Sequence, residues 1–391
     1  MQPHEFNIEL PDALLDDKVV TAMVAVGLSA VNIKVQNNYE ALLAAEPFQS
    51  EVLAIQRLLT LPRLSIGLRV VWEDDIAKRV VASPSIYPML AVLFLIQDVQ
   101  HEVVDMRGQK SPLDASKVRN SLARYQLKAD LFADTQILVC ADSRGHGRPP
   151  DLYDPKTGTL RSRDDFETMV VDILAKQIAN NVGRANSFAF SMALGVIVAE
   201  LFENTDMHGK LELTGVPVKP DGIRGLVIKR IKVLIPQKKV GKGKPPTIDA
   251  PCLEFSVFDS GVGYYPSYTK RALTKETDLR EEWKVLHNCL ERHYYPDLAD
   301  SRLGHRAMGL YEVLRALDTL NGKIEIRTGR LFAYRSFLKG DLPTQMEAAD
   351  STDRPGRPKP KLVDVGKQYL AIPSANEILI GSSVRVIVPL E

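Results

Sequence analysis

Gly195 to Gly209 read GVIVAELFENTDMHG, and this stretch decides how the rest of the chain is interpreted. Its apolar residues recur at helical spacing, which predicts a helix with one buried face. Glu200, Asn204 and His208 stand four residues apart, and this spacing places them in a row on one side of that helix. A carboxylate, a carboxamide and an imidazole in a row beside an apolar face indicate a site rather than a solvated surface.

Three later stretches complete the pattern. Asp259-Ser260-Gly261-Val262-Gly263 follows a predicted strand, Leu253 to Phe258. Gly304-His305-Arg306-Ala307-Met308-Gly309-Leu310 opens a helix that we expect to end near Leu320. The last stretch, Gly381 to Pro389, is a predicted strand of sequence GSSVRVIVP.

In this order the four stretches resemble the N, G1 and G2 boxes and the final Gly-Thr strand of one ATP-binding domain. That domain is shared by DNA gyrase, the heat-shock chaperone ATPases, histidine kinases and MutL, the GHKL superfamily. The resemblance covers about residues 166–391, with Ser382 in the place of the threonine. It implies an α/β fold, a two-layer α/β sandwich of the Bergerat type, with a helix layer on a mixed sheet.

The resemblance also assigns roles at the adenine end of the site. It implies that Asp259 accepts a hydrogen bond from the adenine amino group and that Ser382 supports this carboxylate through its hydroxyl. Gly261 and Gly263 would let the backbone approach the base where a side chain would clash.

At the phosphate end the resemblance implies that the glycine-rich stretch wraps the triphosphate at a helix N-terminus. The ATP-binding residues expected there are Gly304, Arg306, Ala307, Met308, Gly309 and Leu310. Arg306 would add positive charge. Kinase members often have glycine where Ala307 stands, so this phosphate loop would be tighter or less mobile.

The residues on the first helix would complete the site. Asn204 would supply a neutral oxygen to Mg²⁺, and Glu200, one turn earlier, would orient or deprotonate an attacking water or hydroxyl. His208 is open to two interpretations, as an ATP-binding residue or as a side chain that favours the end of a helix through the dipole.

Alternating predicted strands and helices indicate a smaller α/β domain over residues 1–165, followed by the ATP-binding domain over 166–391. The expected strands are Phe6 to Leu10, Ile66 to Trp72 and Gln136 to Ala141, and the expected helices include Glu51 to Thr60 and a long buried one over Pro84 to Val104. Some standalone ATPases of the superfamily carry such an upstream domain, which implies a regulatory or partner-binding role.

Four further segments are connections in this interpretation. Asp142 to Arg148 is read as an exposed turn, with an anion-binding loop as the alternative. Gln237 to Pro246 is read as a basic hairpin tip, because Pro245 excludes the helix of a Walker loop. Tyr264 to Arg302 occupies the place of the nucleotide lid; it is rich in tyrosine and predicts a helix around Lys275 to His293. Lys339 to Lys361 predicts a flexible insertion.

Composition excludes several classes. A formal net charge of +1 gives no general attraction to nucleic acid or to an anionic membrane. Three scattered cysteines do not form a disulfide framework or a zinc site, so a cytoplasmic protein is expected. The N-terminus lacks the pattern of a signal peptide, and the most apolar run, Ile86 to Ile96, is too short to span a bilayer.

The sequence therefore predicts a protein that binds ATP and Mg²⁺. Three activities compete: a nucleotide-driven switch with slow ATP hydrolysis acting on a partner protein, a serine/threonine protein kinase of the anti-sigma-factor type, and a non-catalytic ATP-sensing scaffold. The partner protein is not identified, and a homodimer is compatible with the class. The histidines do not stand in the context of a phosphoacceptor site, which argues against autophosphorylation on histidine.

Overall fold

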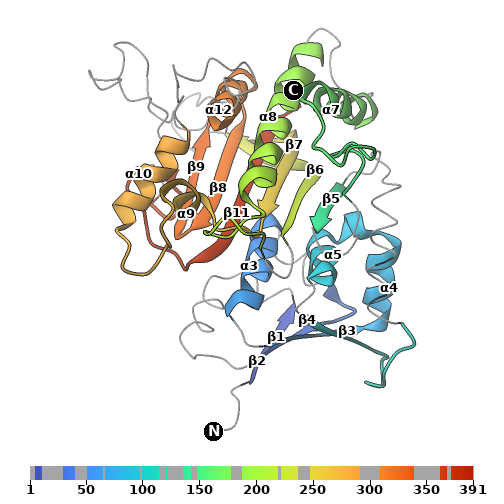
Figure 1. The fold of residues 1–391 in the computed structure, drawn as a ribbon. Helices are drawn as coiled ribbons and strands as arrows, with labels where there is room; N and C mark the ends of the chain where they lie inside the picture. The colour runs from blue at the N-terminus through green and yellow to red at the C-terminus, as the bar shows by residue number, and fades with distance from the viewer. Residues whose placement is uncertain are drawn as a thin grey trace, which may run out of the picture.

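The chain folds into two sheets with helices between them and outside them (Figure 1). The computed structural model describes residues 5–10, 30–39, 51–64, 67–96, 99–113, 116, 120, 135–141, 148–177, 187–218, 222–236, 247–290, 309–338, 362–367 and 371–390. The protein is of the mixed α/β class, as the sequence predicts.

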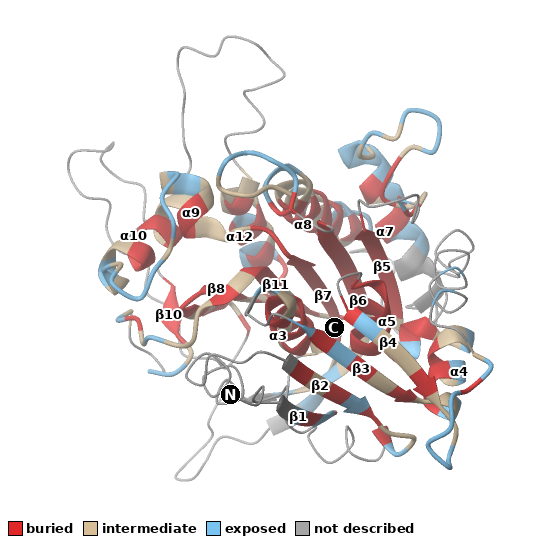
Figure 2. Cartoon of the chain, turned by 60° about the horizontal axis from the view of Figure 1, so that its bottom comes forward, coloured by how far each residue is buried: buried red, intermediate tan, exposed pale blue. Residues whose placement is uncertain are grey.

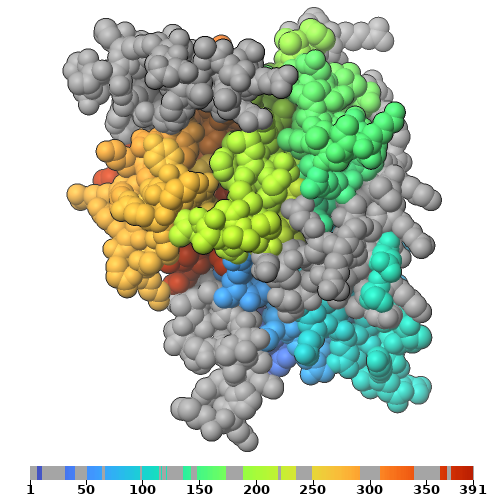
Figure 3. Space-filling model, viewed as in Figure 1, coloured from blue at the N-terminus to red at the C-terminus, as the bar shows by residue number. Residues whose placement is uncertain are grey.

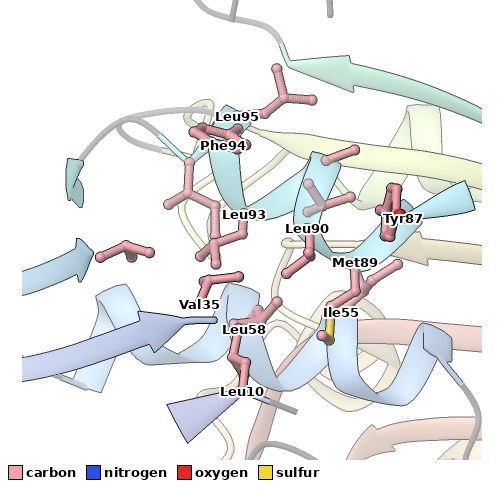
Figure 4. Close-up of a cluster of buried hydrophobic side chains, with 14 of the residues drawn as sticks. Leu10, Val35, Ile55, Leu58, Tyr87, Met89, Leu90, Leu93, Phe94 and Leu95 are labelled. Atoms are coloured by element: carbon pink, nitrogen blue, oxygen red, sulfur yellow. The ribbon is translucent and has the colours of Figure 1, made fainter. Parts of the chain in front are cut away.

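The N-terminal part forms a four-stranded parallel sheet in the order β1-β2-β3-β4. Its strands are β1 (Glu5–Leu10), β2 (Ala30–Val35), β3 (Leu68–Glu73) and β4 (Val99–Val104). The helices of this part are α3 (Glu51–Leu64), α4 (Asp74–Ala82), the 3-10 helix η1 (Pro84–Ile86) and α5 (Pro88–Leu95). Figure 4 shows α3 and α5 side chains such as Leu58 and Leu93 in one apolar core with Leu10 and Val35 of the sheet.

A seven-stranded sheet forms the larger part of the molecule, in the order β10-β9-β8-β11-β7-β6-β5. Its strands are β5 (Thr135–Ala141), β6 (Ile223–Pro236), β7 (Thr247–Asp259), β8 (Lys323–Gly329), β9 (Leu331–Ser336), β10 (Val363–Asp364) and β11 (Leu379–Pro389). The sequence predicts a mixed sheet, but every described pair is antiparallel. The reason is that β11 enters between β7 and β8 and runs opposite to both.

Helices cover one face of this sheet. They are α7 (Arg163–Gln177), α8 (Ser187–His208), α9 (Tyr264–Thr269), α10 (Leu279–Cys289) and α12 (Gly309–Thr319). Apolar residues of α8, including Leu194, Ile197 and Leu201, pack in one core with the strands and with α12. This burial explains why the predicted helix around Glu200 is apolar over most of its circumference.

The other face of the seven-stranded sheet is covered by the N-terminal part, so the central strands are buried on both sides (Figure 2). In β5, Leu138 and Cys140 join the core under α8, whereas Ile137 and Val139 join the N-terminal core. Burial on both faces accounts for the continuous apolar run of this strand. Although β5 lies within residues 1–165, it pairs with β6 and belongs to the larger sheet.

The prediction of one long buried helix over Pro84 to Val104 is wrong. The helical part α5 ends at Leu95, because Ile96 adopts an extended conformation with φ −67° and ψ 117°. The following Val-rich segment forms β4, which pairs in parallel with β3. Its β-branched residues fit a sheet better than a helix, and the indole of Trp72 in β3 donates a 3.1 Å hydrogen bond to Nδ1 of His101.

Within the described residues, the segment Phe188–His208 of α8 is long and apolar enough to cross a membrane by length and composition. Half of the window that meets this criterion is buried inside the fold.

Candidate functional site

Most of the described residues that the sequence assigns to the nucleotide line one cavity of about 620 Å³. It is bounded by the C-terminal half of α8, the adjoining parts of β7 and β11, and α9. The predicted residues among its lining are Asn204, His208, Asp259, Gly263, Gly309, Leu310 and Ser382. The fold thus collects in one place side chains that are up to 178 positions apart in the chain (204 to 382).

Asp259 ends β7 and is only 4% exposed. The N–H of Gly261 donates a 2.9 Å hydrogen bond to its Oδ1, and the hydroxyl of Ser382 donates to its Oδ2. The contact between Ser382 and Asp259 that the sequence predicts is therefore present. Burial raises the pKa of Asp259 to about 6, against the opposing effect of the Ser382 and Gly261 hydrogen bonds. A carboxylate has about four acceptor positions, so a ligand N–H can still be accepted at this fixed point.

Ser382 is the direct cross-strand partner of Asp259 in the pairing of β11 with β7, and a β-bulge in β11 lies immediately before it. The register of β11 against β8 shifts between Leu379 and Ser382, which sets Ile380 and Gly381 outside the regular ladder. Gly381 has φ +68°, and a Cβ at this position would lie 1.9 Å from the carbonyl oxygen of Asp259. Only glycine fits here, because a side chain would collide with the backbone that carries the carboxylate.

Gly381→Ala is therefore expected to lower the free energy of unfolding by about 3 kcal/mol or more, from left-handed strain together with the steric clash. Gly215→Ala is the matched control. Gly215 has φ +79°, but a Cβ there would meet nothing within 4 Å, so strain alone should cost about 1 kcal/mol. Urea unfolding of both variants measures the difference, and equal losses would show that the bulge can move away from Asp259.

Glu200 and Asn204 meet at the first residue of α12. A Cβ on Gly309 would lie 3.3 Å from Oε2 of Glu200 and 3.5 Å from Nδ2 of Asn204. The Glu200 side chain is 14% exposed and lies 3.9 Å from Nη1 of Arg163. Burial, together with the nearby Glu203 and Glu312, raises the pKa of Glu200, while Arg163 opposes the rise.

Gly261 is not part of the cavity lining, in contrast to its expected approach to the base. A Cβ at Gly261 would lie 2.7 Å from the Cα of Gly209, and a Cβ at Gly209 would lie 2.4 Å from the Cβ of Asp259. The two glycines let the turn after α8 pack directly on the end of β7. Gly261 therefore supports Asp259 through its N–H and through this packing.

The described part of the segment expected to form the lid contributes aromatic residues to the cavity. Tyr264 and Tyr268 of α9 line the cavity, and the N–H of Tyr264 donates a 3.1 Å hydrogen bond to Oγ1 of Thr328. Helix α10, expected near Lys275 to His293, begins after Asp278, whose side chain caps the N–H of Arg280.

Helix α10 is held to the sheet by an ion pair that the sequence does not signal. Nε of Arg330, in the β8–β9 turn, donates a 2.9 Å hydrogen bond to Oε2 of Glu282, and its N–H donates one of the same length to Oε1. Both side chains are buried. Neither this pair nor Thr328 could be recognised from spacing, because each depends on contacts between distant parts of the chain.

Several predicted elements lie outside the described residues. They are the site residues Gly304, Arg306, Ala307 and Met308, the turn at 142–147, the basic loop at 237–246, the lid segment 291–302 and the insertion at 339–361.

The side chains around Asn204 suit a metal ion that takes most of its coordinating atoms from a bound substrate and water. Within the described residues, three or more His, Cys, Asp or Glu side chains do not gather into a metal-binding group. Mg²⁺ is usually held by one or two protein oxygens together with substrate phosphates and water. The Asn204 carboxamide, which lines the cavity beside Glu200, fits that pattern.

The arrangement provides a fixed, buried acceptor at Asp259 and a carboxamide at Asn204, and the Glu200 carboxylate lies beside Gly309 without lining the cavity. Between them the cavity is lined by apolar side chains such as Leu201, Val257 and Val384. Such a cavity suits a largely apolar, flat ligand with an N–H group that reaches the buried acceptor. Comparison with protein-family models, with curated proteins and with solved structures finds no match to this chain.

Proposed function

We propose that this chain binds Mg-ATP in a GHKL-type two-layer α/β sandwich and acts as a nucleotide-driven switch on a partner protein, with slow ATP hydrolysis. The observation that carries the proposal is Asp259, a buried carboxylate fixed by Gly261 and Ser382 at the wall of the cavity. Its position in the order of motifs is the one that the resemblance assigns to adenine recognition.

The contact proposed at the adenine end would favour adenine over guanine. The amino group of adenine is a donor, and the carboxylate of Asp259 is an acceptor whose position is set by two hydrogen bonds. Guanine has a carbonyl oxygen at the corresponding ring position, so its acceptor would face a second acceptor. A buried polar group left unpaired in this way costs more than the original hydrogen bond contributes.

The phosphate end supports binding and chemistry. The described part of α12 starts at Gly309, beside Glu200 and Asn204, and the resemblance assigns the N-terminus of this helix to the phosphates. Asn204 would hold Mg²⁺, which neutralises phosphate charge when bound. Glu200, whose pKa is raised by burial and by neighbouring carboxylates, would accept a proton from an attacking water.

A second candidate is a serine/threonine protein kinase of the anti-sigma-factor type. The same Glu200 carboxylate could accept the proton of a serine hydroxyl instead of that of water, because both are neutral O–H nucleophiles. Either activity needs a partner protein, or a second copy of this chain, on the open side of the site.

The three cysteines are free thiols, which supports a reducing cytoplasm as the location.

The test combines binding with product analysis. ATP with Mg²⁺ is expected to raise the melting temperature, because a ligand that binds only the folded state stabilises it by mass action, and GTP should raise it less. Incubation with γ-labelled ATP, with and without cell extract as the source of partner, then separates the activities. Free phosphate supports the switch, labelled protein supports the kinase, and binding without either product supports a sensing scaffold. A melting temperature unchanged by ATP would contradict the proposal.

A further inference from the structure

The bulge next to Ser382 is contacted by a helix from the N-terminal part of the chain. Ile380 and Gly381 lie outside the regular ladder between β11 and β8. Their backbone groups are met by α3, which packs against β11 (Figure 1). The side chains that reach them are Gln56 and Thr60, which stand one helical turn apart on the same face of α3.

Gln56 uses both ends of its carboxamide. Its Nε2 lies 3.2 Å from the carbonyl oxygen of Ile380 and 3.3 Å from those of Gly381 and Arg327. Its Oε1 accepts a 2.8 Å hydrogen bond from the hydroxyl of Ser383. The Gln56 side chain is fully buried, so these contacts replace hydrogen bonds that water would otherwise make.

Thr60 completes the set. Its hydroxyl accepts a 3.0 Å hydrogen bond from the N–H of Ile380 and donates one of 2.9 Å to the carbonyl oxygen of Gln56. Thr60 is also fully buried. This segment of β11 is therefore held from both sides. Asp259 contacts Ser382, and α3 contacts Ile380, Gly381 and Ser383.

Two ion pairs hold α3 against β6 and against the loop that follows α8. Nζ of Lys229 in β6 lies 3.0 Å from Oε2 of Glu51, at the start of α3. Nη1 of Arg63, near its end, lies 2.7 Å from Oε1 of Glu212, in the loop that follows α8. In the space-filling view the blue residues of α3 lie next to the red C-terminal segment and the yellow-green loop (Figure 3).

We propose that Gln56 and Thr60 are positioning residues for adenine recognition, acting through Ile380, Gly381 and Ser383 on the Ser382–Asp259 pair. The N-terminal part is then a working component of the nucleotide site, and a ligand or partner that shifts α3 would change the affinity and base selectivity of the cavity. This inference rests on the proposed function.

The test compares ATP and GTP affinity by calorimetry in Gln56→Ala, with Thr60→Val as a second variant that keeps the side-chain volume. Without the carboxamide the bulge relaxes, and the Asp259 carboxylate loses its alignment with the adenine amino group. ATP affinity should fall about tenfold in Gln56→Ala and a few-fold in Thr60→Val. GTP affinity should change less than about twofold, because GTP does not use that contact.

Ile55→Val is the matched control. Ile55 neighbours Gln56 in sequence but points into the N-terminal core, beside Met89 (Figure 4). The control should lose about 1 kcal/mol of unfolding free energy and keep the ratio of ATP to GTP affinity. A folded Gln56→Ala variant with the wild-type ratio of ATP to GTP affinity would overturn the inference. If Gln56→Ala does not fold, a wild-type ratio in Thr60→Val would overturn it.

A double-mutant cycle locates the effect. In a Ser382→Ala background, Gln56→Ala should cause little further loss of ATP affinity, because both changes act on one contact. Additive losses would place the role of Gln56 elsewhere and contradict the inference. Loss of ATP binding in Asp259→Asn with no change in Gln56→Ala would refute this inference alone. A wild-type protein that binds neither nucleotide would refute the proposed function, and the inference with it.

Discussion

Asp259→Asn is expected to reduce ATP affinity between about tenfold and a hundredfold, the range for losing a hydrogen bond to a charged acceptor. The change is isosteric, and the amide can be accommodated. Its oxygen can accept from the Gly261 N–H, and the Ser382 hydroxyl can turn to accept from its NH₂ group. The variant should therefore fold, and calorimetry with ATP measures the loss directly.

The same variant should be at least as stable as the wild type without nucleotide. Burial raises the pKa of Asp259 from 3.8 to about 6. Between these two pH values the folded state keeps a proton on Asp259 that the unfolded chain releases. The free energy of unfolding contributed by this group is greatest below pH 4 and is lost as the pH rises through 6. The stability of Asp259→Asn relative to the wild type should thus increase from pH 4 to pH 6 and then level off.

Asp364→Asn is the control for a buried aspartate outside the cavity. Asp364 is fully buried and accepts hydrogen bonds from the N–H groups of Lys367 and Ser374. Its replacement should alter stability but leave ATP affinity unchanged. Equal ATP affinity in Asp259→Asn and in the wild type would show that Asp259 does not recognise the base. Urea unfolding at several pH values gives the stability part of the test independently.

The parts of the site that sequence predicts are those with a local pattern. The four-residue spacing of Glu200, Asn204 and His208 requires a helix, and they lie on α8 as expected. Asp259 follows an apolar strand and ends β7. The contact of Ser382 with Asp259 could be predicted only from the resemblance, since the two residues are 123 positions apart.

The parts that sequence does not predict depend on which segments meet in space. Gln56 is 325 positions from Gly381, and a glutamine within an apolar helix carries no local sign of its partner. β5 reads equally well as a strand of an N-terminal domain, because an apolar run does not reveal which sheet it joins. The sequence does not reveal where α5 ends before β4, because the apolar run of α5 suits a buried helix and a buried strand alike.

Glu200 and Asn204 allow binding to be separated from chemistry. Glu200→Gln is expected to slow ATP turnover about a hundredfold, the usual effect of losing an acid–base catalyst, while ATP affinity stays near that of the wild type. Asn204→Ala should instead weaken Mg-ATP binding and lower every activity that depends on it. Calorimetry and phosphate release measure the two effects, and Asp172→Asn, an exposed change on α7, serves as the control.

The outcome of this pair selects among the activities. If both residues act as proposed, the Glu200 variant binds ATP without releasing phosphate, and the Asn204 variant does neither. Full ATP turnover in Glu200→Gln would show that Glu200 is not the general base. The proposal of a switch driven by hydrolysis would then fail. If that result came with lost binding in Asn204→Ala, a sensing scaffold would be the better account, because Mg-ATP would still be held where α8 meets the start of α12. A wild type that transfers phosphate to a protein, with Glu200→Gln inactive in the transfer, would assign the same carboxylate to a kinase.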